Sequence, residues 1–369
     1  MHVLAAMNRA GAETMLMNLH RRIDRNILQF DYAVCAENKC DYDDEILNLG
    51  GRLIKYPRYK IKNHFKYMKF WDKFFAQHDE YKIVHGHMGS TAPLYLAMAK
   101  KHGKFVVAHA HNTRGRFYMP EFMYKIYSHE IHKYADYFMG CSMQALEAIY
   151  GESTAHDNSK SSVFNNAIEA ERYIFNKSVR DEVRHELNLS AADFVIGTVG
   201  RLSQQKNPGK IIEILLALKN RGINFKFLWA GAGELKDEIE KLIYANKLSE
   251  NIKMLGLRND VNRILQALDV FICPSLWEGL PIVAIEAQAA GLASLCSDRC
   301  APEINITSLC KFLPIDNELD NLKWIDAIMK CKDIARRNTF DEIKAAGFDI
   351  SATAEWLQNF YINKAASLF

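Results

Sequence analysis

Short apolar runs alternate with longer amphipathic segments along almost the whole chain, and this alternation constrains the fold more than any other feature. It is typical of β–α–β units, which place their strands in parallel sheets. In the first half the expected strands are 2–7, 30–35, 52–56, 83–87, 105–111, 137–141 and 162–165. In the second half they are 194–199, 225–230, 253–255, 270–273, 293–296 and 312–313. The sequence therefore predicts an α/β protein with two doubly wound parallel sheets.

The chain has 369 residues, which is too long for one ordinary core and suits two domains of roughly 150–200 residues each. A polar stretch at 151–162 separates the two series of strands. We expect Rossmann-like domains at 1–166 and 167–353, and a helix at 354–369 that crosses back to the first domain. Because such sheets bind ligands beyond the carboxyl ends of their strands, the two domains are expected to face each other across a ligand-binding cleft.

Composition excludes several classes of protein. The chain has no run of ~18 uncharged apolar residues, so no membrane-spanning helix is expected. Its opening, MHVLAAMNRAG, is interpreted as a first strand rather than a signal peptide, because charged residues soon follow the apolar ones. The eight cysteines are scattered and include no CxxC pair, which favours free thiols in a reducing compartment. A cytoplasmic protein is therefore expected.

Residues 52–73 form the most basic segment, with eight Lys and Arg, one acidic residue and interleaved aromatics. One interpretation is a solvated helix face above a stripe of core residues. The other is a surface that contacts anionic lipid headgroups at the inner face of the cell membrane, or a pyrophosphate-linked acceptor. A nucleic-acid partner is not expected, because the formal net charge is only +3 and no nucleic-acid-binding motif is present.

The segment PSLWEGLPIVAIEAQ, residues 274–288, carries the strongest functional signal. A buried strand leads into a loop that holds Glu278, and a proline then opens a helix at a position where its missing N–H is not needed. The free amides around Gly279 and Leu280 point off the helix N-terminus, a natural site for phosphate. Glu286 lies roughly 7 Å further along the axis among apolar residues, where an ionised carboxylate needs a partner. The two carboxylates could hold the hexose and the ribose of one nucleotide sugar; the alternative is an acidic loop residue and an ordinary buried glutamate.

Three motifs carry a resemblance to a known family: ETMLMNL near the start, VGRLSQQKNP in the middle, and EGLPIVAIE. The pattern E-G-L-P-x-x-x-x-E resembles the donor signature of the family four glycosyltransferases, which have the GT-B fold of two Rossmann-like domains. The resemblance covers essentially the whole chain, which looks most like bacterial members that assemble exopolysaccharide or capsule. It implies a retaining transferase that requires no metal or other cofactor.

The resemblance also implies roles for individual residues. Arg201 and Lys206, in VGRLSQQKNP, would meet the donor diphosphate, the arginine as a fork and the lysine as a point charge. Leu257 and Arg258 would line the nucleobase pocket. Gly11 lies in the loop that covers the donor phosphates in this family. Alanine replaces the family's first glycine here, which leaves Gly11 as the residue able to take a strained turn.

Two pairs of histidines alternate on neighbouring expected strands, so each pair points to one face of the sheet. These are His85 with His87, and His109 with His111. Four imidazoles could hold a metal ion, but the family works without one, and no metal is expected. By the family's pattern His111 faces the transferred sugar and acts with Glu278 at the catalytic centre. Asn112 and Arg114 are expected to line the same cleft, and His109 to be a core or supporting residue.

These features together predict a retaining glycosyltransferase that moves a hexose from a nucleotide sugar, with UDP favoured, to a hydroxyl of a glycan or lipid-linked acceptor. The expected setting is surface polysaccharide biosynthesis. The expected mechanism is front-side attack, in which the leaving diphosphate takes the proton of the acceptor. Two alternatives stay open: a nucleotide-sugar epimerase of the same fold, or an inactive subunit that binds a sugar nucleotide or a glycan.

Overall fold

The computed structural model describes residues 1–9, 11–89, 91–111, 130–278 and 280–368. The chain divides into two compact units, which we call unit 1 (Met1–Ile168 with Ile350–Phe369) and unit 2 (Glu169–Asp349). The units meet after residues 168 and 349, whereas the sequence analysis placed the boundaries after 166 and 353. The Ile350 amide donates a hydrogen bond to the Ile168 carbonyl at 2.9 Å. This bond joins the two places where the chain passes between the units. Ile350 is buried in a core of unit 1, so the final helix belongs to that unit from its first residue.

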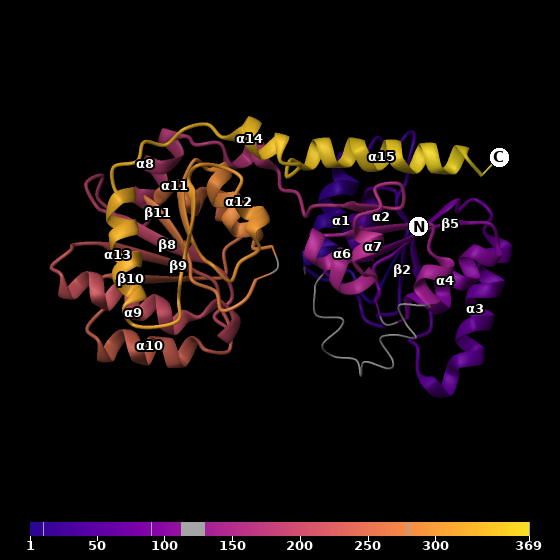
Figure 1. Cartoon of the computed structure of the whole chain (residues 1–369), viewed down its shortest axis with the longest axis horizontal. Helices are drawn as coiled ribbons and strands as arrows, with labels where there is room; N and C mark the ends of the chain where they lie inside the picture. The colour runs from indigo at the N-terminus through magenta and orange to yellow at the C-terminus, as the bar shows by residue number, and fades with distance from the viewer. Residues whose placement is uncertain (10, 90, 112–129, 279, 369) are drawn as a thin grey trace. The chain divides into compact units, whose positions relative to one another are not determined.

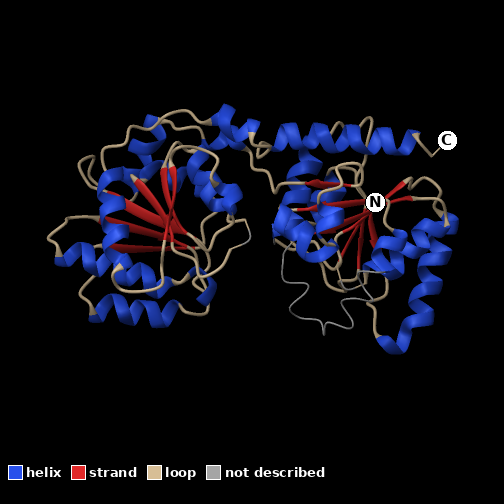
Figure 2. Ribbon diagram, in the orientation of Figure 1, coloured by secondary structure: helices blue, strands red, loops and turns tan. Residues whose placement is uncertain are grey.

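Unit 1 is built around a parallel sheet, whose strands are drawn in red in Figure 2. The described strands follow the order β3-β2-β1-β4-β5-β6-β7. The strands are β1 (His2–Leu4), β2 (Tyr32–Val34), β3 (Leu53–Lys55), β4 (Ile83–Gly86), β5 (Phe105–Ala110), β6 (Tyr137–Gly140) and β7 (Ser161–Val163). Each strand that the sequence predicted forms, generally over a shorter range. The strand order reverses between β1 and β4, which is the point where doubly wound sheets bind ligands.

Helices cover both faces of this sheet (Figure 1). They are α1 (Gly11–Arg22), α2 (Asp43–Asn48), α3 (His64–Gln77), α4 (Ala92–Lys101), α6 (Met143–Tyr150), α7 (Glu152–Ala155) and α15 (Ile350–Ala366). On one face α3 and α4 bury Tyr67, Trp71 and Tyr95 in a common core. On the other face α1 packs against α15, and Leu16 and Leu357 are buried there. The buried residues of α3 recur at helical spacing, which is the core stripe predicted for the basic segment.

Unit 2 contains a second parallel sheet, with the strand order β10-β9-β8-β11-β12-β13 among the described residues. The strands are β8 (Val195–Val199), β9 (Lys226–Ala230), β10 (Ile252–Gly256), β11 (Val270–Cys273), β12 (Ala293–Ser297) and β13 (Cys310–Leu313). The α-helices are α8 (Lys177–Glu186), α9 (Pro208–Asn220), α10 (Lys236–Ala245), α11 (Val261–Ala267), α12 (Ile282–Ala289), α13 (Asp320–Cys331) and α14 (Phe340–Ala345). Two short 3₁₀ segments matter for the site, η3 (Ala170–Tyr173) and η4 (Gln204–Lys206). The order reverses between β8 and β11, so a ligand is expected beyond the carboxyl ends of these two strands.

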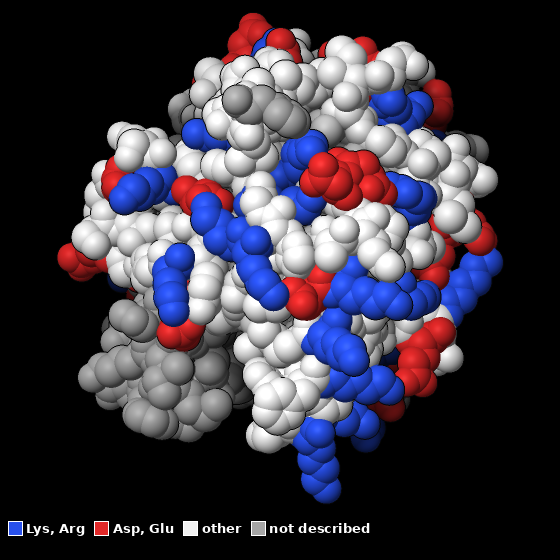
Figure 3. Space-filling model, turned by 90° about the vertical axis from the view of Figure 1, so that its right-hand side faces the viewer, with Lys and Arg blue, Asp and Glu red and all other residues white. Residues whose placement is uncertain are grey.

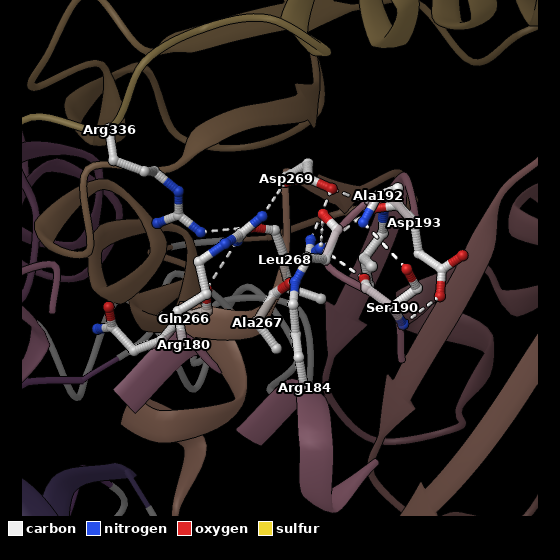
Figure 4. A network of polar contacts seen from close by, with 12 residues as sticks. Arg180, Arg184, Ser190, Ala192, Asp193, Gln266, Ala267, Leu268, Asp269 and Arg336 are labelled. Carbon is white, nitrogen blue, oxygen red and sulfur yellow. Dashed lines mark hydrogen bonds and ion pairs between the residues drawn. The ribbon is translucent and has the colours of Figure 1, made fainter. Parts of the chain in front are cut away.

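A network of charges and carbonyl groups fixes the opposite, amino-terminal edge of the unit 2 sheet (Figure 4). Asp269, directly before β11, accepts hydrogen bonds from Arg180 at 2.5 Å, from Arg184 at 2.9 Å and from the Val195 amide at 2.7 Å. The two arginines also donate to the carbonyl groups of residues 266–268. Both cations are therefore paired, and they tie α8 to β8 and β11.

Among the described residues, no helix combines the length and the apolar character that crossing a bilayer requires. All eight cysteines are free thiols, as predicted. Cys273 and Cys296 are direct neighbours across β11 and β12, at the carboxyl end of the sheet.

Candidate functional site

The loop that follows β11 is held by its neighbours on both sides. Ser275 is fully buried, and its carbonyl accepts a hydrogen bond from the Ser297 hydroxyl at 2.6 Å. Further along, the Glu278 amide donates to the Arg299 carbonyl at 3.3 Å. Gly279, expected to offer an amide to phosphate, lies outside the described residues. The loop therefore holds Glu278 at the carboxyl edge of the sheet, at the switch point where the strand order reverses.

Lys206 and Glu278, both predicted site residues, meet in the structure. The Lys206 Nζ lies 2.5 Å from the Glu278 Oε1, and the two side chains are only 24% and 9% exposed. The Ser275 hydroxyl also donates to Glu278 Oε1, at 3.4 Å. Burial raises the pKa of the Glu278 carboxyl, and the Lys206 ammonium opposes this shift. The site therefore holds a cation and a carboxylate together in a place with little water.

The loop that carries Lys206 is locked to the Glu278 loop through the backbone. The Gln205 carbonyl accepts from the Leu276 amide at 2.9 Å, and the Gln205 side chain donates to the Trp277 carbonyl at 3.1 Å. Gly200 and Gly231 allow the end of β9 to pass close to the loop that carries Lys206. A Cβ at Gly231 would lie 1.9 Å from the Gly200 carbonyl oxygen, so only glycine fits where β9 passes this loop.

Arg201, the second predicted cation, leaves the same loop toward solvent. Its side chain is 72% exposed, and its Nε donates to Glu234 Oε2 at 3.1 Å. In this state Arg201 and Lys206 are paired with different carboxylates. The proposed joint contact with a diphosphate stays a prediction, and it would require both ion pairs to open or to be shared.

Glu286 has a partner that the sequence did not suggest. It is the fifth residue of α12, and the Tyr173 hydroxyl donates to its Oε1 at 2.7 Å. Tyr173 ends η3, which packs against α12 directly after the unit boundary. Burial raises the pKa of Glu286, and the Tyr173 hydrogen bond opposes this shift. No spacing in the sequence links the two residues, because the contact depends on how the linker returns to the sheet.

The remaining predicted residues of unit 2 lie near the same edge. Leu280 is half-buried directly before Pro281, the N-cap of α12. Leu257 follows β10 and is 83% exposed. Arg258 is held in a fork by Asp260, with Nε and Nη2 donating at 2.8 and 2.7 Å. These residues therefore lie at the ends of strands and helices. The contact of Leu257 and Arg258 with a nucleobase stays a prediction.

In unit 1, Gly11 is the first residue of α1, and a Cβ there would meet nothing within 4 Å. Its place in a loop over the donor phosphates stays a prediction. The preceding Ala10 lies outside the described residues.

His111 stands directly after β5, within a group of imidazoles. Its Nε2 is hydrogen-bonded to His87 Nδ1 at 2.7 Å, and its ring stacks on His109 with centroids 4.1 Å apart. Burial lowers the pKa of His111 to about 4, so the ring is neutral near pH 7. Its Nδ1 is buried and has no hydrogen-bond partner among the described residues. Asn112 and Arg114, expected in the same place, lie outside the described residues.

Two groups of described residues could hold a metal ion. They are His2 with His85 and His87, and His87 with His109 and His111; within each group the ring nitrogens lie within 4.8 Å of one another. A metal binds in the plane of each imidazole. In the second group the rings of His109 and His111 are stacked, with planes tilted by 27° and centroids 4.1 Å apart.

Known proteins resemble this chain in sequence and in fold. The family model described as glycosyl transferases group 1 matches residues 179–333. The chain is 30% identical to the putative glycosyltransferase EpsF of Bacillus subtilis, over 98% of this chain and 95% of that protein. It is 27% identical to the UDP-Gal:alpha-D-GlcNAc-diphosphoundecaprenol alpha-1,3-galactosyltransferase of Escherichia coli, over 77% of this chain and 76% of that one. The crystal structure of Anabaena HepE in complex with UDP matches 100% of this chain and 97% of that chain, with a TM-score of 0.74 and 15% identity.

Proposed function

The chain belongs to the glycosyl transferases group 1 family and has the GT-B fold, and from this premise we propose a retaining transferase that takes a hexose from a UDP-sugar. The acceptor would be a hydroxyl of a glycan or of a lipid-linked glycan in surface polysaccharide synthesis. The E. coli relative supports this acceptor class, because its name specifies a diphosphoundecaprenol-linked sugar. HepE supports UDP as the nucleotide, because it was crystallised with it.

The observation that carries the proposal is the pairing of Lys206 with Glu278 at the switch point of unit 2. A lysine there suits a diphosphate, and a carboxylate beside it suits the hydroxyls of a hexose. Glu286 would accept from the ribose hydroxyls. Arg201, Leu257 and Arg258, with the amides at Gly279 and Leu280, would complete the contacts with the nucleotide.

In the proposed reaction, cationic side chains of the protein would take the place of a metal. As the bond between the anomeric carbon and the diphosphate breaks, negative charge gathers on UDP, where Lys206 and Arg201 would stabilise it. The acceptor oxygen bonds to the same face of the anomeric carbon, and its proton passes to the leaving diphosphate. In unit 1, His111 would hold a hydroxyl of a sugar substrate.

We also propose a peripheral contact between unit 1 and an anionic membrane. The basic side chains of 52–73 are all exposed, and Figure 3 shows Lys and Arg gathered on this side of unit 1. Ile61 and Phe65, at the start of the α3 region, are 87% and 88% exposed among them. Exposed apolar side chains ringed by lysines are the pattern of a surface that inserts between headgroups. The opposite side of α3 is the buried core stripe, so the segment would serve both expected roles on different faces.

Release of UDP from UDP-glucose, UDP-galactose and UDP-N-acetylglucosamine tests the proposed function. We expect the wild type to release UDP from at least one of them, and Lys206→Ala and Glu286→Ala to lower the rate by roughly tenfold or more. Lys236→Ala and Glu240→Ala are matched controls, because these residues form an exposed ion pair on α10. Conversion of the sugar without UDP release would indicate an epimerase. Binding without turnover would indicate an inactive subunit.

A further inference from the structure

Three buried groups of unit 1 form a continuous row of hydrogen bonds that the proposed function does not use. His85, on β4, lies between Tyr361 of α15 and His109 of β5. Its Nδ1 is hydrogen-bonded to the Tyr361 hydroxyl, and its Nε2 is 3.1 Å from His109 Nδ1. The row therefore runs from the C-terminal helix into the sheet.

The charge state of each member is set by burial. All three side chains are almost completely buried. Burial holds the pKa of His85 and His109 well below the ordinary value, and that of Tyr361 well above it. Each imidazole is therefore neutral near pH 7 and carries one N–H, and the tyrosine keeps its phenolic proton.

The direction of the hydrogen bonds follows from this proton count. Tyr361 has no acceptor for its proton among the described residues except His85 Nδ1, and a buried O–H without an acceptor is costly. Tyr361 therefore donates to His85 Nδ1. The single N–H of His85 is then on Nε2, from which it donates to His109 Nδ1, and the single N–H of His109 must be on Nε2.

His109 Nε2 is buried and has no partner within the described ranges. The ring beside it has the same property, because the His111 Nδ1 is also buried without a partner there. His111 ends a second row, in which His87 lies between His2 and His111 at 3.0 and 2.7 Å. Two stacked, neutral imidazoles thus each keep one nitrogen that no described residue satisfies. A neutral N–H donor carries no charge of its own, and it matches the neutral hydroxyl of a sugar.

We propose that the His109 Nε2–H, oriented by Tyr361 and His85, donates to a hydroxyl of a sugar substrate beside His111. His109 is then a ligand-binding residue rather than a packed core residue, and Tyr361 and His85 are positioning residues. The identity of the ligand as a sugar rests on the proposed function, whereas the position of the proton does not. A metal ion at the same histidines is the competing use.

The proton position can be measured by long-range ¹H–¹⁵N correlation on protein labelled with ¹⁵N-histidine. We expect one tautomer of His109, with hydrogen on Nε2, and a mixture of tautomers in Tyr361→Phe. Tyr56→Phe is the matched control, because Tyr56 is an equally buried tyrosine of unit 1 whose hydroxyl donates to the Leu4 carbonyl instead. Hydrogen on His109 Nδ1 in the wild type, or an unchanged tautomer in Tyr361→Phe, overturns the proposal.

Ligand additions to the same sample test the binding role. The three UDP-sugars are expected to shift the His109 signals when the sugar belongs to the donor, and free glucose with UDP when it is an acceptor. No shift with any of them, in protein that calorimetry shows to bind UDP, overturns this inference and leaves the proposed function standing. Failure to bind UDP at all would instead contradict the proposed function. Stoichiometric Zn²⁺ binding that removes the Nε2–H tautomer also overturns the inference, in favour of a metal site.

Discussion

The ammonium group of Lys206 lies 2.5 Å from the carboxylate of Glu278, so the two groups proposed for the diphosphate and the hexose neutralise each other before any donor binds. Such a pair keeps a lysine and a glutamate in a poorly hydrated place without leaving either charge alone. A diphosphate would compete with Glu278 for the lysine. The carboxylate so released is next to the place where the first sugar must lie.

This competition predicts opposite effects of the two single substitutions. Lys206→Met should weaken UDP binding by roughly tenfold to a hundredfold, the loss of a charge-assisted contact of about 1.5–3 kcal/mol. It should also lower the free energy of unfolding by about 1–3 kcal/mol, because Glu278 is left buried and unpaired. Glu278→Gln should leave UDP binding unchanged or stronger while it slows UDP release from a UDP-sugar. Calorimetry with UDP and urea denaturation measure both effects.

The control for this pair is Lys236→Met, which removes an exposed lysine of the same unit. It should change neither UDP affinity nor stability by a measurable amount. Weaker UDP binding in Glu278→Gln would contradict the competition, because it would mean that the carboxylate supports the nucleotide rather than opposing it.

Tyr173→Phe is expected to raise the pH below which the protein loses its affinity for UDP. Glu286 can accept from ribose only as a carboxylate, and burial raises its pKa, so affinity is retained above that pKa and lost as the pH falls through it. The Tyr173 hydrogen bond stabilises the carboxylate; without it the pKa rises further. Calorimetry over a pH series measures the pH at which each protein loses its affinity for UDP. The ionisation of UDP itself affects both proteins equally. Tyr244→Phe, at an exposed tyrosine of unit 2, should not change the pH at which UDP affinity is lost.

The Glu278 and Glu286 contacts show where sequence reasoning succeeds and where it ends. Both glutamates could be placed at the end of a strand and on the following helix, because the apolar run before them and the proline between them are local signals. Their partners are not local. Lys206 reaches Glu278 from the loop after β8, and Tyr173 reaches Glu286 from the segment after the unit boundary. Only the folded chain brings these segments together.

The histidines of unit 1 lead to the same conclusion on a finer scale. Alternation on β4 and β5 was enough to predict that His85 and His109 share a face with their neighbours. Their hydrogen bonds depend on the register of the two strands, in which His85 pairs with Val107, and on a tyrosine 276 residues further along the chain.

Gly231→Ala should disturb the nucleotide site through the backbone alone. The added methyl group would lie 1.9 Å from the Gly200 carbonyl oxygen and would push the loop that carries Arg201 and Lys206. We expect a loss of about 2 kcal/mol or more in stability, together with weaker UDP binding. Gly209→Ala is the control, because a Cβ there meets nothing within 4 Å in α9 and should stabilise the helix by up to about 1 kcal/mol. Unchanged UDP affinity in Gly231→Ala would show that the loop position does not matter for binding.

The basic segment makes a prediction about membranes that is independent of the nucleotide site. Phe65 is 88% exposed among the lysines of 52–73, and inserting it between headgroups would remove a large apolar side chain from water. Phe65→Ser should therefore weaken binding to vesicles of phosphatidylcholine mixed with phosphatidylglycerol by roughly tenfold. Tyr244→Ser is the matched control, because Tyr244 is an aromatic residue of unit 2 that is 82% exposed.

Charge reversal separates insertion from electrostatic attraction. Lys62→Glu with Lys66→Glu should weaken binding to the same vesicles by about 1 kcal/mol per lysine, and more at low salt than at high salt. Vesicles of phosphatidylcholine alone should bind the wild type weakly and should not distinguish it from the charge variant. Flotation or co-sedimentation of the vesicles measures all of these affinities. Equal binding to neutral and anionic vesicles would mean that the lysines have no role, and equal binding of the Phe65 variant would remove insertion from the proposal.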